Sequence, residues 1–110
     1  MVMQLHPSDF EQWRQAHAAP MVLDVREPWE VETASVKADR FELKVIAMGE
    51  IPTRWQELDP SRPIACLCHH GMRSLQVARY LEQQGFAEVV NLQGGIDAWS
   101  SAVDPTVPRY

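Results

Sequence analysis

A cysteine that opens a short loop is the feature of this chain best suited to chemistry. The loop consists of Cys68, His69, His70, Gly71, Met72, Arg73 and Ser74, and it lies between an apolar segment and a helical pattern. Backbone N–H groups turned into such a loop, together with the positive end of the following helix, stabilise an anion. The same conditions favour a thiolate. The run therefore predicts a nucleophilic cysteine in an anion-binding loop.

The residues that follow Cys68 have separate expected roles. Arg73 carries a charge that does not titrate, and it can either contact an anionic substrate or close the loop. Gly71 supplies the positive φ that a loop with inward amides needs. At most one of His69 and His70 is expected to face the anion, because adjacent loop residues usually point in different directions. The alternatives are a structural thiol and a surface arginine.

The second cysteine, Cys66, lies two residues before Cys68 on the same predicted strand. Its side chain should share a face with Cys68 but lie deeper in the sheet, as a buried and inert thiol. A disulfide between the two would need strained geometry. A zinc site of Cys66, Cys68, His69 and His70 is possible by residue type, but no second ligand pair has metal-site spacing. We therefore expect no metal.

Length and composition limit the class of protein. The 110 residues suffice for one hydrophobic core, so we expect a single domain over residues 1–110. A net charge of -5 argues against nucleic acid as the main partner. No apolar run approaches the length of a membrane span, and residues 1–19 lack the apolar core of a secretory signal. We expect a cytoplasmic protein that does not bind a membrane.

Alternating apolar and helical patterns indicate an α/β fold with helices on both faces of a parallel sheet. The apolar segments are Val2–Leu5, Met21–Val25, Leu43–Ala47, Ile64–Leu67 and Val89–Leu92. The first helical pattern begins at Pro7, and the others cover Glu50–Leu58, Ser74–Gln84 and Ile96–Ser101. In the third pattern we expect Ser74 as the N-cap and Gly85 at the end of the helix. In such a fold, ligands bind beyond the carboxyl ends of the strands, where Cys68 lies.

The remaining segments are predicted as loops and packing residues. Residues 31–42 lack a clear period, which indicates a long exposed loop that can form one wall of the site. Residues 104–110 contain two prolines and read as an extended tail. Three of the four tryptophans, Trp29, Trp55 and Trp99, are too far apart for a stacking platform, so we expect them in core or lid packing.

Asp24 and Arg26 come where the second apolar segment ends, near the same edge of the sheet as Cys68. They are candidates to brace the Cys68 loop through hydrogen bonds. A cap on the turn at Glu27-Pro28 is an equally good interpretation of Asp24.

Three motifs together resemble those of a single-domain rhodanese. They are Leu23–Glu27 with Trp29 and Glu30, the loop Cys68–Ser74, and Asn91–Trp99. Their order and spacing match over roughly the whole chain. The resemblance implies a five-stranded parallel sheet and a sulfurtransferase in which Cys68 takes sulfane sulfur from a donor and passes it to a thiophilic acceptor. It also implies that the backbone amides of His69 to Ser74 cradle the persulfide, with Arg73 as the loop arginine.

The loop also narrows the chemistry that the resemblance implies. Related cysteine phosphatases place one residue more between cysteine and arginine than this chain places between Cys68 and Arg73. The histidines and Arg73 suit an anionic donor, thiosulfate or a protein persulfide, with cyanide, a thiol or a sulfur-carrier protein as acceptor and no cofactor. Alternatives are a non-catalytic partner-binding module and, less favoured, a cysteine phosphatase or arsenate reductase. The chain departs from the family at residues 36–40, which lack the usual Gly-His-Ile-Pro-Gly-Ala-like segment.

Overall fold

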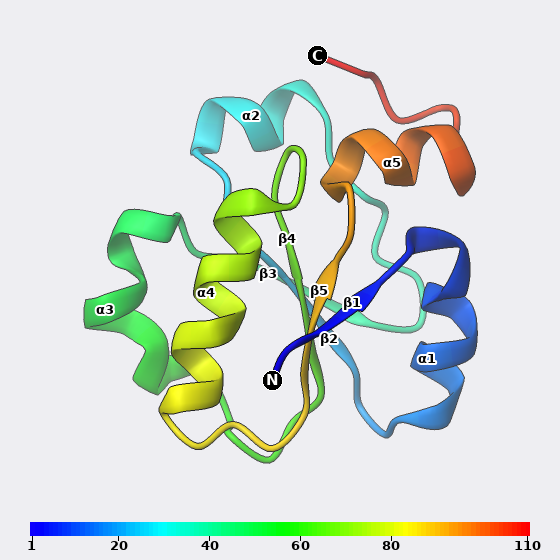
Figure 1. Cartoon of the computed structure of the whole chain (residues 1–110). Helices are drawn as coiled ribbons and strands as arrows, with labels where there is room; N and C mark the ends of the chain where they lie inside the picture. The colour runs from blue at the N-terminus through cyan, green and yellow to red at the C-terminus, as the bar shows by residue number, and fades with distance from the viewer.

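A single sheet of five parallel strands forms the centre of the molecule (Figure 1). The computed structural model describes all residues from 1 to 110. The strands are β1 (Met3–Leu5), β2 (Met21–Asp24), β3 (Glu42–Val45), β4 (Ile64–Leu67) and β5 (Val89–Leu92). Their order across the sheet is β1-β5-β4-β2-β3, and every neighbouring pair is parallel. The predicted five-stranded parallel sheet is confirmed, with β4 at its centre.

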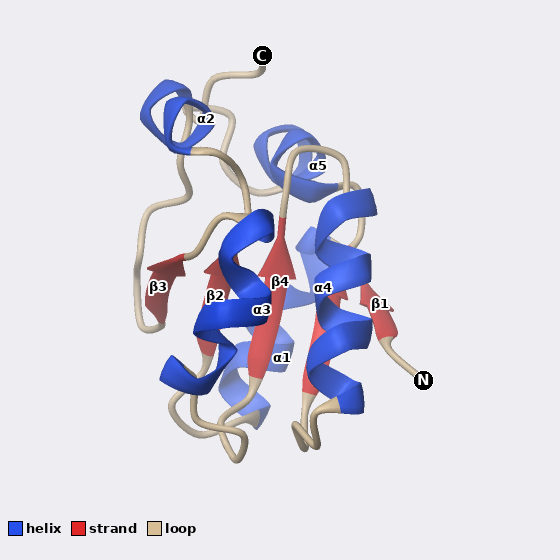
Figure 2. Ribbon diagram, turned by 90° about the vertical axis from the view of Figure 1, so that its left-hand side faces the viewer, coloured by secondary structure: helices blue, strands red, loops and turns tan.

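Helices cover both faces of this sheet (Figure 2). The α-helices are α1 (Phe10–Ala16), α2 (Pro28–Thr33), α3 (Ile51–Arg54), α4 (Met72–Gln83) and α5 (Gly95–Ala102). Two separate clusters of buried apolar side chains lie on the two sides, one under α3 and α4 and the other under α1 and α5. No helix is both long enough and apolar enough to cross a membrane. The α/β class with helices on both faces is therefore also confirmed.

The two cysteines lie on the α4 side of the sheet. Cys66 and Cys68 both belong to the apolar cluster under α3 and α4, while Ala65 and Leu67 belong to the cluster on the other face. This alternation follows from the period of two along a strand. It confirms that the cysteines share a face.

Most helices start and end where local signals predict. The first helical turn begins at Pro7, as a 3-10 turn over Pro7–Asp9, and α4 ends just before Gly85, which has a φ of 94°. The helix predicted over Glu50–Leu58 is wrong as one element. Instead, the short helix α3 lies between two 3-10 turns, Met48–Glu50 and Trp55–Glu57. Only Ile51 and Leu58 are buried in the predicted segment, so packing against the core gives little support to a longer helix.

The prediction of a long exposed loop over residues 31–42 is wrong in its first half. A capping box of Glu27 and Glu30 starts α2, which continues to Thr33, and the next apolar residues, Ala34 and Val36, are buried under α1 and α5. Trp29 is not a core residue, since it is 62% exposed. Trp99 is buried, and Trp55 packs partly buried against the core.

Candidate active site

Cys68 is the first residue after β4, at the carboxyl edge of the sheet, and α4 begins four residues later (Figure 2). The residue is 1% exposed. Its Sγ accepts a hydrogen bond from the Gly71 N–H at 3.0 Å. The twelve-residue helix α4 directs its positive end at the same loop. A backbone donor and a helix N-terminus therefore both stabilise negative charge on this sulfur.

Two glycines allow the loop to take this shape. Gly71 has a φ of 98°, and a Cβ there would lie 3.0 Å from the Gly94 nitrogen. Gly95, at the start of α5, packs so tightly against the loop that a Cβ would overlap the carbonyl oxygens of Cys68 and His69. Those carbonyls accept hydrogen bonds from Ile96 N–H (2.8 Å) and Asp97 N–H (3.2 Å). The first turn of α5 thus holds these two loop carbonyls in place.

Ser74 is not the N-cap of α4, which contradicts the prediction. Gly71 takes the N-cap position, and Ser74 lies in the first turn, fully buried. Its Oγ is 2.6 Å from Asn91 Oδ1 and 3.3 Å from Cys68 Sγ. A hydroxyl has one proton, so it can donate to only one of these acceptors at a time. Ser74 is placed to turn its proton to the sulfur when the thiol ionises.

Asn91 supports this arrangement and was not among the predicted site residues. It is fully buried on β5, and its Nδ2 donates to Gly71 O at 3.0 Å and to Gln4 Oε1 at 2.8 Å. A single amide within the apolar strand Val89–Leu92 was the signal that could have identified it, since a buried polar side chain needs partners.

The sequence predicts that the two loop histidines point in different directions, but in the structure they do not. Their rings stack at 3.9 Å between centroids, and the other face of His69 stacks on Tyr110, also at 3.9 Å. The prediction is wrong because the C-terminal residues, expected to form an extended tail, return to the site. Val107 is buried and Arg109 pairs with Asp97, which places the Tyr110 ring against the loop. His70 is exposed, Met72 is 70% exposed, and His69 Nε2 is buried without a partner.

Arg73 forms a two-point ion pair with Glu30 of α2, at 2.7 and 2.9 Å. The hydrogen bonds from Arg73 hold the pKa of Glu30 at about 2, aided by a bond from Tyr110 Oη. Burial raises the pKa of Tyr110 to about 12. Neither Glu30 nor Tyr110 was a predicted site residue, although Glu30 belongs to the first of the three motifs that resemble those of a rhodanese.

Asp24 and Arg26 pair with each other at 2.7 Å, and both side chains are fully buried. Arg26 also donates to Glu30 O, Ala34 O and Tyr110 Oη, while Asp24 accepts from the Arg26 N–H in the turn. These residues make no direct hydrogen bond to the Cys68 loop. They fix α2 and Tyr110, and so act on the loop indirectly, through the Glu30–Arg73 pair and through the stacking of Tyr110 on His69.

One group of side chains has the residue types of a metal site. Ligand atoms of His69, His70 and Asp97 lie within 4.8 Å of one another. Both carboxylate oxygens of Asp97 accept hydrogen bonds from Arg109, at 2.9 and 3.2 Å. We assign no metal to these residues, because the arginine already neutralises the carboxylate.

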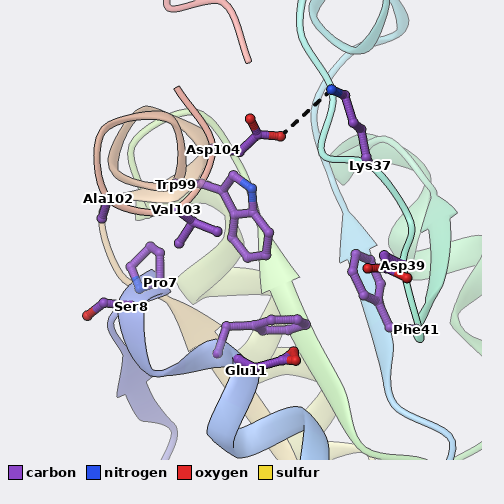
Figure 3. A pocket seen from close by; sticks show the side chains of 11 residues that line it. Pro7, Ser8, Glu11, Lys37, Asp39, Phe41, Trp99, Ala102, Val103 and Asp104 are labelled. Carbon is purple, nitrogen blue, oxygen red and sulfur yellow. Dashed lines mark ion pairs between the residues drawn. The ribbon is translucent and has the colours of Figure 1, made fainter. Parts of the chain in front are cut away.

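The largest cavity is shown in Figure 3, and neither Cys68 nor any other residue of its loop lines it. It has a volume of about 640 Å³ and is lined by residues of α1, α5 and the segment before β3, among them Phe10, Phe41 and Trp99. Lys37 and Asp104 form an ion pair at its rim. The Cys68 sulfur therefore lies in its loop rather than in this cavity.

Comparison with known proteins agrees with this geometry. A family model described as "Rhodanese-like domain" matches residues 6–102. The chain belongs to the rhodanese-like family. The rhodanese-like chain is 37% identical over 84 residues to "Putative sulfurtransferase YtwF" of Bacillus subtilis, covering 76% of this chain and 77% of the relative. A solved rhodanese-related protein from Thermoplasma volcanium superposes with a TM-score of 0.80 at 29% identity, covering 98% and 99% of the two chains.

A further relative shows a rhodanese-like segment within a longer protein. The chain is 42% identical over 94 residues, 81% of its length, to "Rhodanese-like/PpiC domain-containing protein 12, chloroplastic" of Arabidopsis thaliana. It spans only 30% of that relative's length.

Proposed function

We propose that this rhodanese-like protein is a sulfurtransferase that carries sulfane sulfur as a persulfide on Cys68. The donor is thiosulfate or a protein persulfide, and the acceptor is cyanide, a thiol or a sulfur-carrier protein. The observation that carries the proposal is the Gly71 N–H donating to Cys68 Sγ at 3.0 Å, ahead of the first turn of α4. Relatives support it, since one is named thiosulfate sulfurtransferase GlpE and another a putative sulfur carrier protein.

The reaction has two covalent steps. With thiosulfate, the Cys68 thiolate attacks the outer sulfur, a new S–S bond forms, the old one breaks, and sulfite leaves with the electron pair. A thiophilic acceptor then removes the terminal sulfur and regenerates the thiolate. The Gly71 amide and the α4 N-terminus face the sulfur, so they stabilise the thiolate before transfer and the persulfide after it.

Cys66 is unsuited to this role. It is fully buried within β4, and burial raises the pKa of its thiol well above the ordinary value. A neutral thiol is a poor nucleophile. This makes Cys66, two residues before Cys68 and on the same face of the sheet, a matched control.

The test measures transfer from thiosulfate to cyanide and the mass of the protein after exposure to the donor. We expect Cys68→Ser to lose turnover and the added sulfur atom, and Cys66→Ser to keep both. Activity that survives in Cys68→Ser overturns the proposal, and loss confined to Cys66→Ser moves the nucleophile one position inward on the same face. If neither thiosulfate nor a persulfide adds sulfur to the wild type, the chain is a binding module rather than an enzyme.

A further inference from the structure

The arginine of the active-site loop is neutralised within the protein. Arg73 Nη1 lies 2.7 Å from Glu30 Oε1 and Nη2 lies 2.9 Å from Glu30 Oε2, so the planar guanidinium meets the carboxylate edge to edge. The Glu30 side chain is 5% exposed and that of Arg73 is 36% exposed. A substrate anion would therefore meet an ion pair without net charge at this position.

Other bonds prevent Glu30 from releasing Arg73 easily. Its carboxylate also accepts from Tyr110 Oη at 2.7 Å and from the Glu27 N–H at 3.1 Å. Tyr110 Oη in turn accepts from Arg26 Nη1 at 2.8 Å. If Arg73 turned to a substrate, a buried carboxylate would lose its only ionic partner, which is strongly unfavourable.

The other arginines around the loop are paired as well. Arg26 is held by Asp24 with both side chains fully buried, and Arg109 is held by Asp97. His69 and His70 carry no permanent charge. The whole chain has a net charge of -5, so its long-range field repels anions. A dianion therefore finds backbone amides at this site but no unpaired permanent cation.

We propose that the sulfur donor of this site is an organic persulfide, small or protein-borne, rather than thiosulfate. This assignment rests on the proposed function of Cys68. A persulfide carries at most one charge on its transferable sulfur group, which the Gly71 amide and the α4 N-terminus can face, whereas thiosulfate brings two charges and releases sulfite. In the transfer, the Cys68 thiolate bonds to the outer sulfur of R–S–SH, the donor S–S bond breaks, and R–S⁻ leaves with the electron pair. The proton stays on the transferred sulfur or passes to R–S⁻.

The experiment compares thiosulfate with the persulfide of cysteine as donors to the wild type, Glu30→Gln and Glu32→Gln. Glu32 is exposed on the same helix and serves as the control. We expect the wild type to load sulfur faster from the persulfide. Glu30→Gln frees the charge of Arg73, so kcat/KM for thiosulfate should rise about fivefold or more, mainly through KM, while the persulfide value changes less than about twofold. Glu32→Gln should leave both donors unchanged.

A measurement on the wild type alone keeps the test independent of whether the variant folds. If Arg73 were free to attract thiosulfate, added salt would slow loading by thiosulfate. We expect salt to leave that rate unchanged or to raise it, because only the repulsive net charge is screened. Loading from thiosulfate that equals or exceeds loading from the persulfide, or that slows with salt, overturns the substrate assignment alone. Failure of both donors to load Cys68 overturns the proposed function instead.

Discussion

The pair between Glu30 and Arg73 should make the stability of the fold depend on pH in a defined direction. The hydrogen bonds from Arg73 lower the pKa of Glu30 from 4.5 to about 2 in the folded protein. A carboxyl with a depressed folded pKa stabilises the native state above its unfolded pKa, and this stabilisation is lost as pH falls toward the folded value. Glu30 should therefore contribute fully above about pH 5 and progressively less below it.

The size of the effect follows from the same values. A decrease in pKa from 4.5 to about 2 corresponds to a ceiling of about 3 kcal/mol in the free energy of unfolding. Solvent screens the pair, because Arg73 is 36% exposed and exposed ion pairs contribute about 1 kcal/mol or less. We therefore expect about 1 to 2 kcal/mol at neutral pH, with more than about half of it lost by pH 3.

The assay is urea unfolding of the wild type, Glu30→Gln and Glu32→Gln at a series of pH values from neutral to about 3, followed by tryptophan fluorescence. Gln at position 30 cannot ionise, so the difference in unfolding free energy between wild type and Glu30→Gln should shrink as the pH falls. The difference between wild type and Glu32→Gln should stay small throughout. A gap for Glu30→Gln that stays constant from neutral pH to pH 3 would refute the claim that an ionised Glu30 supports the fold.

Two further predictions concern the walls of the loop. Gly95→Ala should lower the free energy of unfolding by about 3 kcal/mol or more in urea titrations, because a Cβ would overlap loop carbonyls at a φ of 61°. Gly49→Ala, where nothing lies within 4 Å, should change it by less than about 1 kcal/mol, and equal losses would contradict the packing argument. Ser74→Ala should slow alkylation of Cys68 by iodoacetamide about threefold or more, since the thiolate loses a donor. Ser101→Ala, at an exposed position of α5, is its control, and an unchanged rate in Ser74→Ala would remove the assigned role.

The sheet and the site loop could be predicted because their determinants are local. Ile64–Leu67 is apolar throughout, and all four of its residues are buried. Gly71 follows at the position where the backbone needs a positive φ. Strand and turn are both encoded within about ten residues, so the place of Cys68 at the edge of the sheet needed no long-range information.

The surroundings of the loop could not be predicted because they depend on the path of distant segments. Tyr110 lies 80 residues from Glu30 along the chain, yet the two side chains are joined by a hydrogen bond of 2.7 Å. The same return of the chain stacks Tyr110 on His69 and aligns the histidine rings. No periodicity or turn signal in residues 104–110 indicates this contact, since it is stabilised by side chains of α2 and the loop rather than by regular structure.

The loop sequence and the surroundings of the loop give different indications of the substrate. The type of residue at Arg73 indicates an anion, because a guanidinium in a loop of inward amides is a typical anion ligand. The environment of Arg73 argues against attraction of an anion by this arginine, because Glu30 cancels its charge before any substrate arrives. The loop sequence by itself leads to the hypothesis of a nucleophilic sulfur. Donor preference depends on a carboxylate from another helix, so chains with the same loop and a different residue at the Glu30 position should differ in their use of thiosulfate.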